Sequence, residues 1–275
     1  MDREHILNIL NREAITEVGV LPLSFCKIVN QRLLDRLPFR AESVVLFLVP
    51  YYTGRGNNLS AYAVSEDYHF YMEELFKRIC PLLEKCYEGE CFCGFSDHSP
   101  IDERDAVLQT GLAMKGDNRL LIHDTYGSFF FVAELFSTLE PTKIGFCGEK
   151  EVRECLHCGA CRAACPTGTL RASDRVCLSA LTQKKGELTE EEQKIIRQNG
   201  TAWGCDACQN VCPYNQGKIT PISFFHRAQI SRLTKEKLLA MDEESFARRA
   251  YAWRGRQTVM RNLEILEEAE AVNDR

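Results

Sequence analysis

The sequence predicts an α+β protein in three consecutive parts: a mixed helix-and-strand domain over 1–146, a ferredoxin-like domain over 147–222 and a helical tail over 223–275. Three observations lead to this division. Hydrophobic residues make up 45% and charged residues 27% of the 275-residue chain, as in ordinary globular proteins. Strand and helix patterns alternate before residue 147. Cysteines then concentrate in two short runs, ahead of a segment rich in helix-start signals.

The strand patterns all lie in the N-terminal part. Residues 43–50 form an apolar run that ends at a proline, which is typical of a fully buried strand. Two further strands are expected over 119–123 and 128–136, on either side of a turn at 124–127.

The same part contains two helix signals. Over 66–86 the apolar side chains recur near one helix face, and Pro81 is expected to interrupt that helix. A second helix is expected to start at Ser99, with the serine as its cap, Pro100 in the first turn and Asp102 three residues after the cap.

Later in the chain, helix starts are marked by capping residues. Thr189 and Glu192 form a capping box, and the helix they open should end near Gly200. This helix would separate the two cysteine runs. In the tail, helices are expected to start at Thr234 and Asp242.

Charge and hydropathy exclude several classes of protein. No apolar run approaches the roughly 18 residues of a membrane helix, and the charged start lacks the apolar region of a secretory signal. We therefore expect a cytoplasmic monomer that makes no membrane contact. A net charge of −5 argues against a uniformly basic nucleic-acid binder, although it permits a local basic patch.

The cysteine spacing indicates iron–sulfur chemistry. The first run reads C-x2-C-x2-C-x3-C before Pro166, which is the pattern of bacterial two-cluster ferredoxins, and the second reads C-x2-C-x3-C before Pro213. Two [4Fe-4S] cubanes need eight thiolates, and Cys177 is the obvious eighth. The first cluster is assigned to Cys155, Cys158, Cys161 and Cys212, and the second to Cys165, Cys177, Cys205 and Cys208.

A four-cysteine zinc ribbon is the main alternative, but it leaves the other cysteines and the C-x3-C-P endings without a role. The remaining cysteines show no such regularity. Cys26, Cys80 and Cys147 are expected to be small buried residues. Cys86, Cys91 and Cys93 read as unpaired loop thiols, with a redox or metal loop as the alternative.

The tail carries a stretch without acids, from 247 to 263, in which arginines and aromatic residues alternate. Such a stretch could grip phosphates and stack on bases, or it could be a solvated helix face whose arginines pair with flanking acids. Both interpretations stay open. The residues are Arg248, Arg249, Tyr251, Trp253, Arg254, Arg256 and Arg261.

Together with the cysteine runs, several short motifs resemble the epoxyqueuosine reductase family and, more distantly, the reductive dehalogenases. The resemblance covers roughly 40–265. Tyr62-Ala63 with Asp67-Tyr68-His69 is similar to that family's R-Y-A-x-G-x-D-Y-H element, with Ala61 in place of arginine and Ser65 in place of glycine. The other matching elements are Asp97-x2-Pro100-x3-Arg104, Gly116-x-Asn118, Tyr126-Gly127-Ser128, Cys177-x-Ser179, Gly204-Cys205-Asp206 and Arg261-Asn262.

The resemblance implies a cobalamin-binding N-terminal domain and reduction of epoxyqueuosine to queuosine in tRNA, with electrons from an external low-potential donor. Asp97 would be the catalytic proton donor near the cobalt. The residues implied around corrin and substrate are Tyr62, Asp67, Tyr68, His69, Asp97, Arg104, Tyr126 and Ser128. By itself, Asp97 reads as a turn or capping acid and His69 as a helix-face residue. His157 is expected to be a loop residue that tunes its cluster.

Departures from the family pattern keep two other functions open. Asp117 and Arg119 replace a lysine and a threonine, and the chain lacks the helical-repeat extension of many members. A corrinoid reductase of a different, smaller substrate would fit these departures. A non-catalytic two-cluster electron-transfer protein is the third reading, and it leaves the motifs from Tyr62 to Glu134 without a purpose.

Overall fold

The computed structural model describes residues 2–146, 148, 150–172 and 174–273, and Cys147 lies outside them. The chain packs into two compact units that interleave in sequence, whereas the sequence predicted three consecutive parts. The sheet unit comprises Met1–Tyr51, His69–His157 and Thr220–Ile222. The cysteine unit comprises Tyr52–Tyr68, Cys158–Ile219 and Ser223–Arg275. No helix among the described residues has the length and hydropathy needed to cross a bilayer.

The sheet unit is built on a four-stranded antiparallel sheet in the order β1-β2-β6-β3. Its strands are β1 (Val18–Pro22), β2 (Ser43–Pro50), β6 (Phe130–Ser137) and β3 (Phe92–Phe95). Every residue of β2 is buried, which confirms the fully buried strand expected over 43–50.

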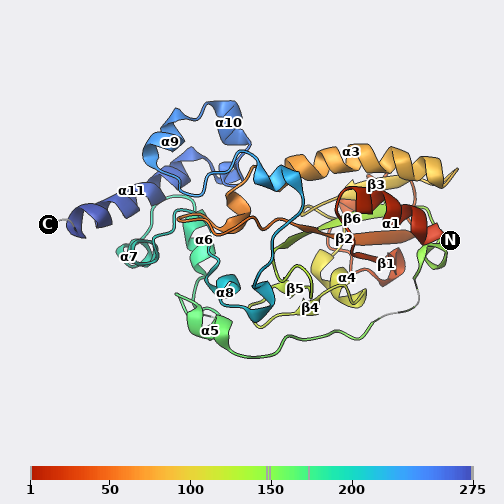
Figure 1. Cartoon of the computed structure of the whole chain (residues 1–275), viewed down its shortest axis with the longest axis horizontal. Coiled ribbons are helices and arrows are strands. Elements are labelled where there is room, and N and C mark those ends of the chain that lie inside the picture. The colour runs from red at the N-terminus through yellow and green to blue at the C-terminus, as the bar shows by residue number, and fades with distance from the viewer. Residues whose placement is uncertain (1, 147, 149, 173, 274–275) are drawn as a thin grey trace. The chain divides into compact units, whose positions relative to one another are not determined.

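The two faces of this sheet are covered by different helices, as Figure 1 shows. Side chains alternate along a strand, so Leu46 and Phe47 of β2 point to opposite faces. Leu46 packs in a cluster with Ala106 of α4 (Glu103–Gln109), whereas Phe47 meets Phe76 of α3 (Tyr68–Cys86). The unit also contains α1 (Asp2–Arg12), α2 (Gln31–Leu34), η1 (Leu23–Phe25) and η3 (Pro141–Ile144).

The expected interruption at Pro81 was wrong, because α3 continues through it to Cys86. A proline inside a helix removes one backbone hydrogen bond and usually kinks the helix. Here Ile79 before the proline and Leu83 after it are both fully buried, while Pro81 itself faces solvent. Burial of one apolar face therefore holds the helix together across the proline.

The start of α4 also differs from the expectation. Asp102, not Ser99, is the N-cap residue, and its side chain accepts from the amide of Asp105. Ser99 is buried and donates its hydroxyl to Glu134 instead. Burying a carboxylate without a hydrogen-bond donor costs free energy. Ser99 therefore serves as the donor to Glu134 and not as the helix cap that the local pattern predicted.

The strands expected on either side of the 124–127 turn belong to different sheets. β5 (Leu121–Ile122) pairs with β4 (Met114–Lys115) in a separate two-stranded sheet, while β6 lies inside the large sheet. Between them, His123 and Gly127 exchange two backbone hydrogen bonds and close the turn.

The cysteine unit is helical, and its helix starts follow the predicted caps. α7 (Glu190–Asn199) has the expected capping box at Thr189 and ends at Gly200 in the left-handed conformation. α9 (Lys235–Ala240) and α10 (Glu243–Ala247) start after Thr234 and Asp242 as predicted. The sequence predicted two helices in the tail, but α10 ends at Ala247 and a third helix follows. This helix, α11 (Arg256–Asn273), packs against α6 (Leu178–Gln183), α7 and α9 (Figure 1).

The remaining elements of this unit are short helices around the cysteines and turns of the tail. They are α5 (Ala160–Ala164), α8 (Ala207–Asn210), η2 (Ala61–Ala63), η4 (Pro213–Asn215), η5 (Ser223–His226) and η6 (Ala252–Arg254). Their common core is formed by fully buried Trp203 and Tyr251, whose rings meet edge to face.

Residues 52–68 join the cysteine unit through buried polar contacts. The carboxylate of Asp206 accepts the hydroxyl of Ser60 and, at 2.6 Å, the amide of Ala61. The amide of Ser60 in turn donates to the carbonyl of Trp203. A segment far away in sequence is therefore fixed to the loop that carries Cys205 and Cys208.

Candidate functional site

Seven of the eight predicted cluster cysteines lie in the cysteine unit, and several of them stand at helix ends. Cys165 follows α5 as its C-cap, Cys177 precedes α6, and Cys212 precedes η4. Cys161 and Cys208 lie within the short helices α5 and α8. Short helices and turns bring cysteines spaced by two or three residues onto one side of the loop, as cluster binding requires.

The thiols of the second predicted set lie within electrostatic reach of one another. Burial raises the pKa of Cys205 to about 11, and the negative charges of Cys177 and Cys165 add to the rise. Burial likewise raises the pKa of Cys208 to about 12, with contributions from Cys205 and Cys177. Thiolates gathered in this way need positive charge beside them, which iron would supply.

Cys165 has the opposite tendency. Its burial would raise the thiol's pKa, but hydrogen bonds from the backbone of Leu170, Thr167 and Thr169, and from the Thr167 side chain, outweigh burial and lower it. Amides aimed at a sulfur stabilise the thiolate that binds metal. The donor set of this unit therefore fits an iron–sulfur cluster.

Cys155 lies in the sheet unit together with His157, which the sequence analysis placed near a cluster. Its Sγ accepts from the amide of Asp117 at 3.4 Å. The Asp117 carboxylate is 2.9 Å from Nδ1 of His157, and Glu154 holds the other ring nitrogen at 3.1 Å. Hydrogen bonding to Asp117, helped by its charge, raises the pKa of exposed His157. Ligand atoms of Asp117, Cys155 and His157 all lie within 4.8 Å of one another.

Asp97 and His69, two of the residues implied by the family resemblance, meet in the sheet unit. The carboxylate Oδ2 of Asp97 is 3.6 Å from Nε2 of His69, and both side chains are at least half exposed. The hydrogen bond from His69 lowers the pKa of Asp97, against the effect of partial burial. Asp97 also has a φ of +66°, which is uncommon for a residue other than glycine.

The other implied residues of the sheet unit have partners within it. The Tyr126 hydroxyl lies 2.7 Å from that of Thr16, and Arg104 donates to the carbonyl of Arg119. Ser128 is buried. Near them, the side-chain nitrogen of buried Asn118 has no hydrogen-bond acceptor among the residues that the structure describes.

Three implied residues lie in the cysteine unit. The Tyr62 hydroxyl accepts from the indole nitrogen of Trp203 at 2.8 Å, and burial raises the pKa of Tyr62. The amide of Asp67 donates to the carbonyl of Arg248, and Tyr68 begins α3. The roles of all these residues stay predictions.

Most arginines of the tail make contacts inside the cysteine unit. Arg248 forms a two-pronged ion pair with Glu66 at 2.6 and 2.8 Å. Arg256 donates to the carbonyls of Leu238 and Met241, Arg261 to those of Lys184 and Gly186, and buried Arg249 to that of Ala228. Arg254 instead lies over the Trp253 ring at 3.8 Å, and Trp253 is 59% exposed.

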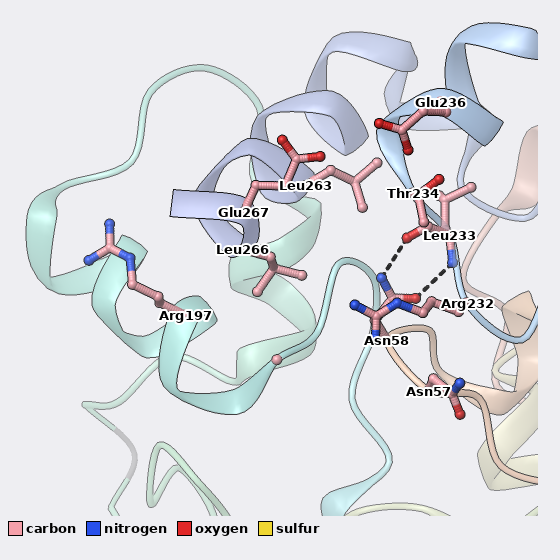
Figure 2. Close-up of a pocket in the computed structure, with 11 residues that line it drawn as sticks. Asn57, Asn58, Arg197, Arg232, Leu233, Thr234, Glu236, Leu263, Leu266 and Glu267 are labelled. Carbon is pink, nitrogen blue, oxygen red and sulfur yellow. Dashed lines mark hydrogen bonds between the residues drawn. The ribbon is translucent and has the colours of Figure 1, made fainter. Parts of the chain in front are cut away.

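A cavity of about 470 Å³ lies elsewhere in this unit, between α7, α11 and the start of α9 (Figure 2). Asn58 and Leu233 both line the cavity, and the Asn58 side chain exchanges two hydrogen bonds with the backbone of Leu233, at 2.7 and 2.9 Å. The wall carries charges of both signs and none of the predicted site residues. Its charged residues are Arg197, Arg232, Glu236 and Glu267.

Sequence reasoning missed two acidic residues: Glu103, which contacts Asp97, and Glu134, whose carboxyl group interacts with that of Glu103. Glu103 accepts from the Asp97 amide at 2.9 Å, and Glu134 is completely buried on β6. Glu103 lies inside the Asp97-x2-Pro100-x3-Arg104 element, and an acid within an apolar strand was the available signal at Glu134. Cys26 is buried as expected, whereas Cys80 is half-buried on α3. The expectation of loop thiols was wrong for exposed Cys86, which ends α3, and for half-buried Cys93, which lies in β3.

Comparisons with known proteins agree with the cysteine pattern. Residues 154–215 match the family of 4Fe-4S double cluster binding domains, which confirms the iron–sulfur expectation. The epoxyqueuosine reductase of Francisella cf. novicida is 32% identical over 199 residues, covering 69% of this chain and 53% of that protein. The epoxyqueuosine reductase of Cyclobacterium marinum is 28% identical over 273 residues, covering 91% of this chain and 84% of that protein.

The fold is shared as well. A crystal structure of an epoxyqueuosine reductase with an epoxyqueuosine-modified stem loop of tyrosine tRNA superimposes with a TM-score of 0.74 and 22% identity. The superposition covers 97% of this chain and 81% of that one. This chain spans about half the length of the Francisella relative, 53%, and most of the Cyclobacterium one.

Proposed function

The chain is related to the epoxyqueuosine reductase family, and from this relationship we propose that it is an iron–sulfur and cobalamin-dependent oxidoreductase that reduces epoxyqueuosine to queuosine in tRNA. The observation that carries the proposal is the presence, in one chain, of a double-cluster cysteine set and an exposed Asp97–His69 pair. Removing the epoxide oxygen to leave an alkene takes two electrons and two protons and releases water. The chain therefore needs an electron supply and an acid.

The cysteines would hold the electron supply. Cys165, Cys177, Cys205 and Cys208 would bind one [4Fe-4S] cluster, and the first set, with Cys155, the other. Each cluster passes one electron at a time, so two clusters match a two-electron reduction, and an external low-potential donor must reload them. The fit is supported by the thiol charges that act on Cys205 and Cys208.

Cobalamin would be held by the residues that the family resemblance implies, which are Tyr62, Asp67, Tyr68, His69, Arg104, Tyr126 and Ser128. When bound, its cobalt would supply the bond-breaking chemistry that amino acid side chains lack. Buried Asn118 supports the fit, because its unsatisfied amide nitrogen could donate to an acceptor group of the corrin periphery.

Asp97 would deliver a proton to the departing oxygen. Its carboxyl group is exposed, and contact with His69 lowers its pKa. At neutral pH the carboxylate must therefore take up a proton before it can give one, since only the protonated form is an acid. His69 would orient the carboxylate between turnovers.

A second candidate is a corrinoid reductase of a smaller substrate. The contacts of the tail favour it, because Arg248, Arg249, Arg256 and Arg261 are engaged within the cysteine unit rather than extended toward a phosphate backbone. Arg254 and Trp253 are then the main arginine–aromatic pair of the tail that could meet RNA.

The experiment is anaerobic reconstitution of the full chain with iron, sulfide and cobalamin, followed by assay on tRNA from a strain that accumulates epoxyqueuosine. We expect about eight irons per chain, cobalamin bound and queuosine formed. Cobalamin binding without turnover of this tRNA would favour the smaller substrate. Failure to bind cobalamin would leave a two-cluster electron carrier.

A further inference from the structure

Glu134 occupies an unusual position for an acid. It lies in the middle of β6, opposite Leu46 of β2 and Phe95 of β3, and its residue exposure is 0%. Directly opposite residues share a sheet face, so Glu134 points to the face covered by α4. Its Oε2 accepts the hydroxyl of Ser99, whose oxygen in turn accepts the amide of Ile101.

The other oxygen of Glu134 has no fixed donor. Oε1 is buried and has no hydrogen-bond partner among the described residues. The carboxyl group of Glu103, the first residue of α4, interacts electrostatically with that of Glu134. Two ionised carboxylates cannot donate to each other, and their repulsion is large in a dry environment. A proton shared between the two groups would satisfy the orphaned oxygen and remove one charge.

The surroundings of the two side chains also favour a proton. Burial, helped by the charges of Asp97 and Asp102, raises the pKa of Glu103 to about 7, against the hydrogen bond from the Asp97 amide. Burial also raises the pKa of Glu134, with Glu103 as the next contribution. The charge of Glu134 in turn helps raise the pKa of buried Cys26 to about 12, after burial.

Glu103 joins this pair to Asp97. Its Oε1 accepts the amide of Asp97 at 2.9 Å, which holds Asp97 at a φ of +66° with its carboxylate beside His69. The hydrogen bond thus joins half-buried Glu103 to the backbone of Asp97, whose carboxylate is exposed. The order from the core outward is Glu134, Glu103, Asp97 and His69.

We propose that Glu103 and Glu134 form a carboxyl–carboxylate pair that keeps one proton behind Asp97 and returns it to Asp97 after each delivery. The delivery step rests on the proposed function. One O–H bond of the pair breaks as one forms on the Asp97 carboxylate, and solvent protons then refill the pair. Asp97 is the catalytic residue in this scheme, while Glu103 and Glu134 act through it.

The shared proton is tested by infrared titration of the purified full chain with isotopically labelled glutamate. We expect one protonated glutamate C=O band, lost with a midpoint near pH 7. The band should change in frequency and midpoint in Glu103→Gln and in Glu134→Gln, because the proton loses its second carboxyl group, and stay as in the wild type in Glu140→Gln, a half-exposed control. A wild-type chain without this band, or a band with the wild-type frequency and midpoint in both pair variants, would overturn the pair.

The delivery step is tested by turnover. Glu103→Gln keeps an oxygen to accept the Asp97 amide, so it preserves the loop, but it has no proton to release. We expect kcat to fall roughly tenfold or more with KM unchanged, and loss of the alkaline limb that the wild type shows near pH 7. Partial recovery is expected in Glu103→Asp. Wild-type kcat in Glu103→Gln at every pH would overturn delivery.

The two arms separate this inference from the proposed function. Turnover of epoxyqueuosine tRNA without the glutamate band overturns the pair and leaves the proposed function standing. The band without any turnover by the wild type overturns the proposed function and the delivery step, while the shared proton stands.

Discussion

The carboxylate of Asp97 lies 3.6 Å from the imidazole of His69, although one residue follows β3 and the other stands in the first turn of α3. The contact places an acid with a lowered pKa on the exposed side of the sheet unit. It joins two motifs that the sequence presents separately, and it gives the proposed reduction a candidate proton donor.

Asp97→Asn should abolish most of the turnover while leaving the cofactors bound. Asparagine keeps the size and hydrogen bonding of the side chain but cannot donate an acidic proton. We expect kcat on epoxyqueuosine tRNA to fall by about 100-fold or more, which is the usual contribution of a positioned general acid. Iron and cobalamin content should match the wild type. Unchanged turnover would remove Asp97 from the mechanism.

The pair formed by Glu103 and Glu134 should make the protein less stable as the pH rises. The folded pKa of Glu103, about 7, exceeds the value of about 4.3 for an exposed glutamate, so the folded chain binds a proton that the unfolded chain has lost in this window. The free energy of unfolding should therefore be fully retained below about pH 4 and decline up to about pH 7, by at most about 1.4 kcal/mol per pH unit.

Denaturant titrations at several pH values measure this decline. In Glu134→Gln the slope over the same window should flatten, because one titrating carboxyl of the pair has gone. Glu140→Gln is the control and should retain the wild-type slope. An equal slope in all three proteins would contradict the pair.

Cys205→Ala should lose iron, whereas Cys26→Ala should not. Cys205 lies in the cysteine unit within electrostatic reach of Cys177 and Cys165. Cys26 packs in the core of the sheet unit, where burial raises its pKa to about 12 and keeps it a protonated thiol. Iron analysis of anaerobically purified protein measures the difference. We expect about eight irons in Cys26→Ala and a loss of about four in Cys205→Ala.

The arginines of the tail should divide into two classes. Arg261→Ala removes hydrogen bonds to the carbonyls of Lys184 and Gly186, so the melting temperature should fall. Arg254→Ala removes the stacking on exposed Trp253, so stability should be kept. If the substrate is tRNA, Arg254→Ala should weaken binding and reduce the salt dependence by about one phosphate contact. Equal tRNA affinity in Arg254→Ala would favour the smaller substrate.

Local patterns were sufficient for part of this protein. Seven of the eight predicted cluster cysteines follow from spacing, because two or three intervening residues fix how far apart neighbouring thiolates stand, and Cys177 completes the eight that two cubanes need. The buried strand over 43–50 and the helix opened at Thr189 also followed from neighbours in sequence. Such features depend on interactions within about one helical turn or one strand, and the order of residues in the sequence is enough to predict them.

Tertiary packing decided the rest, because the partners are far apart in sequence. Ser99 and Glu134 are 35 residues apart in sequence. Their contact explains why Ser99, the expected helix cap, instead donates a hydrogen bond to a buried acid. Arg248 and Glu66 are 182 residues apart in sequence. Arg248, one of the arginines that the sequence offered as a phosphate contact, instead forms an ion pair with Glu66. A sequence shows which groups carry charge, but the free energy of a charge depends on burial and on the nearest partner, and only the folded chain fixes both.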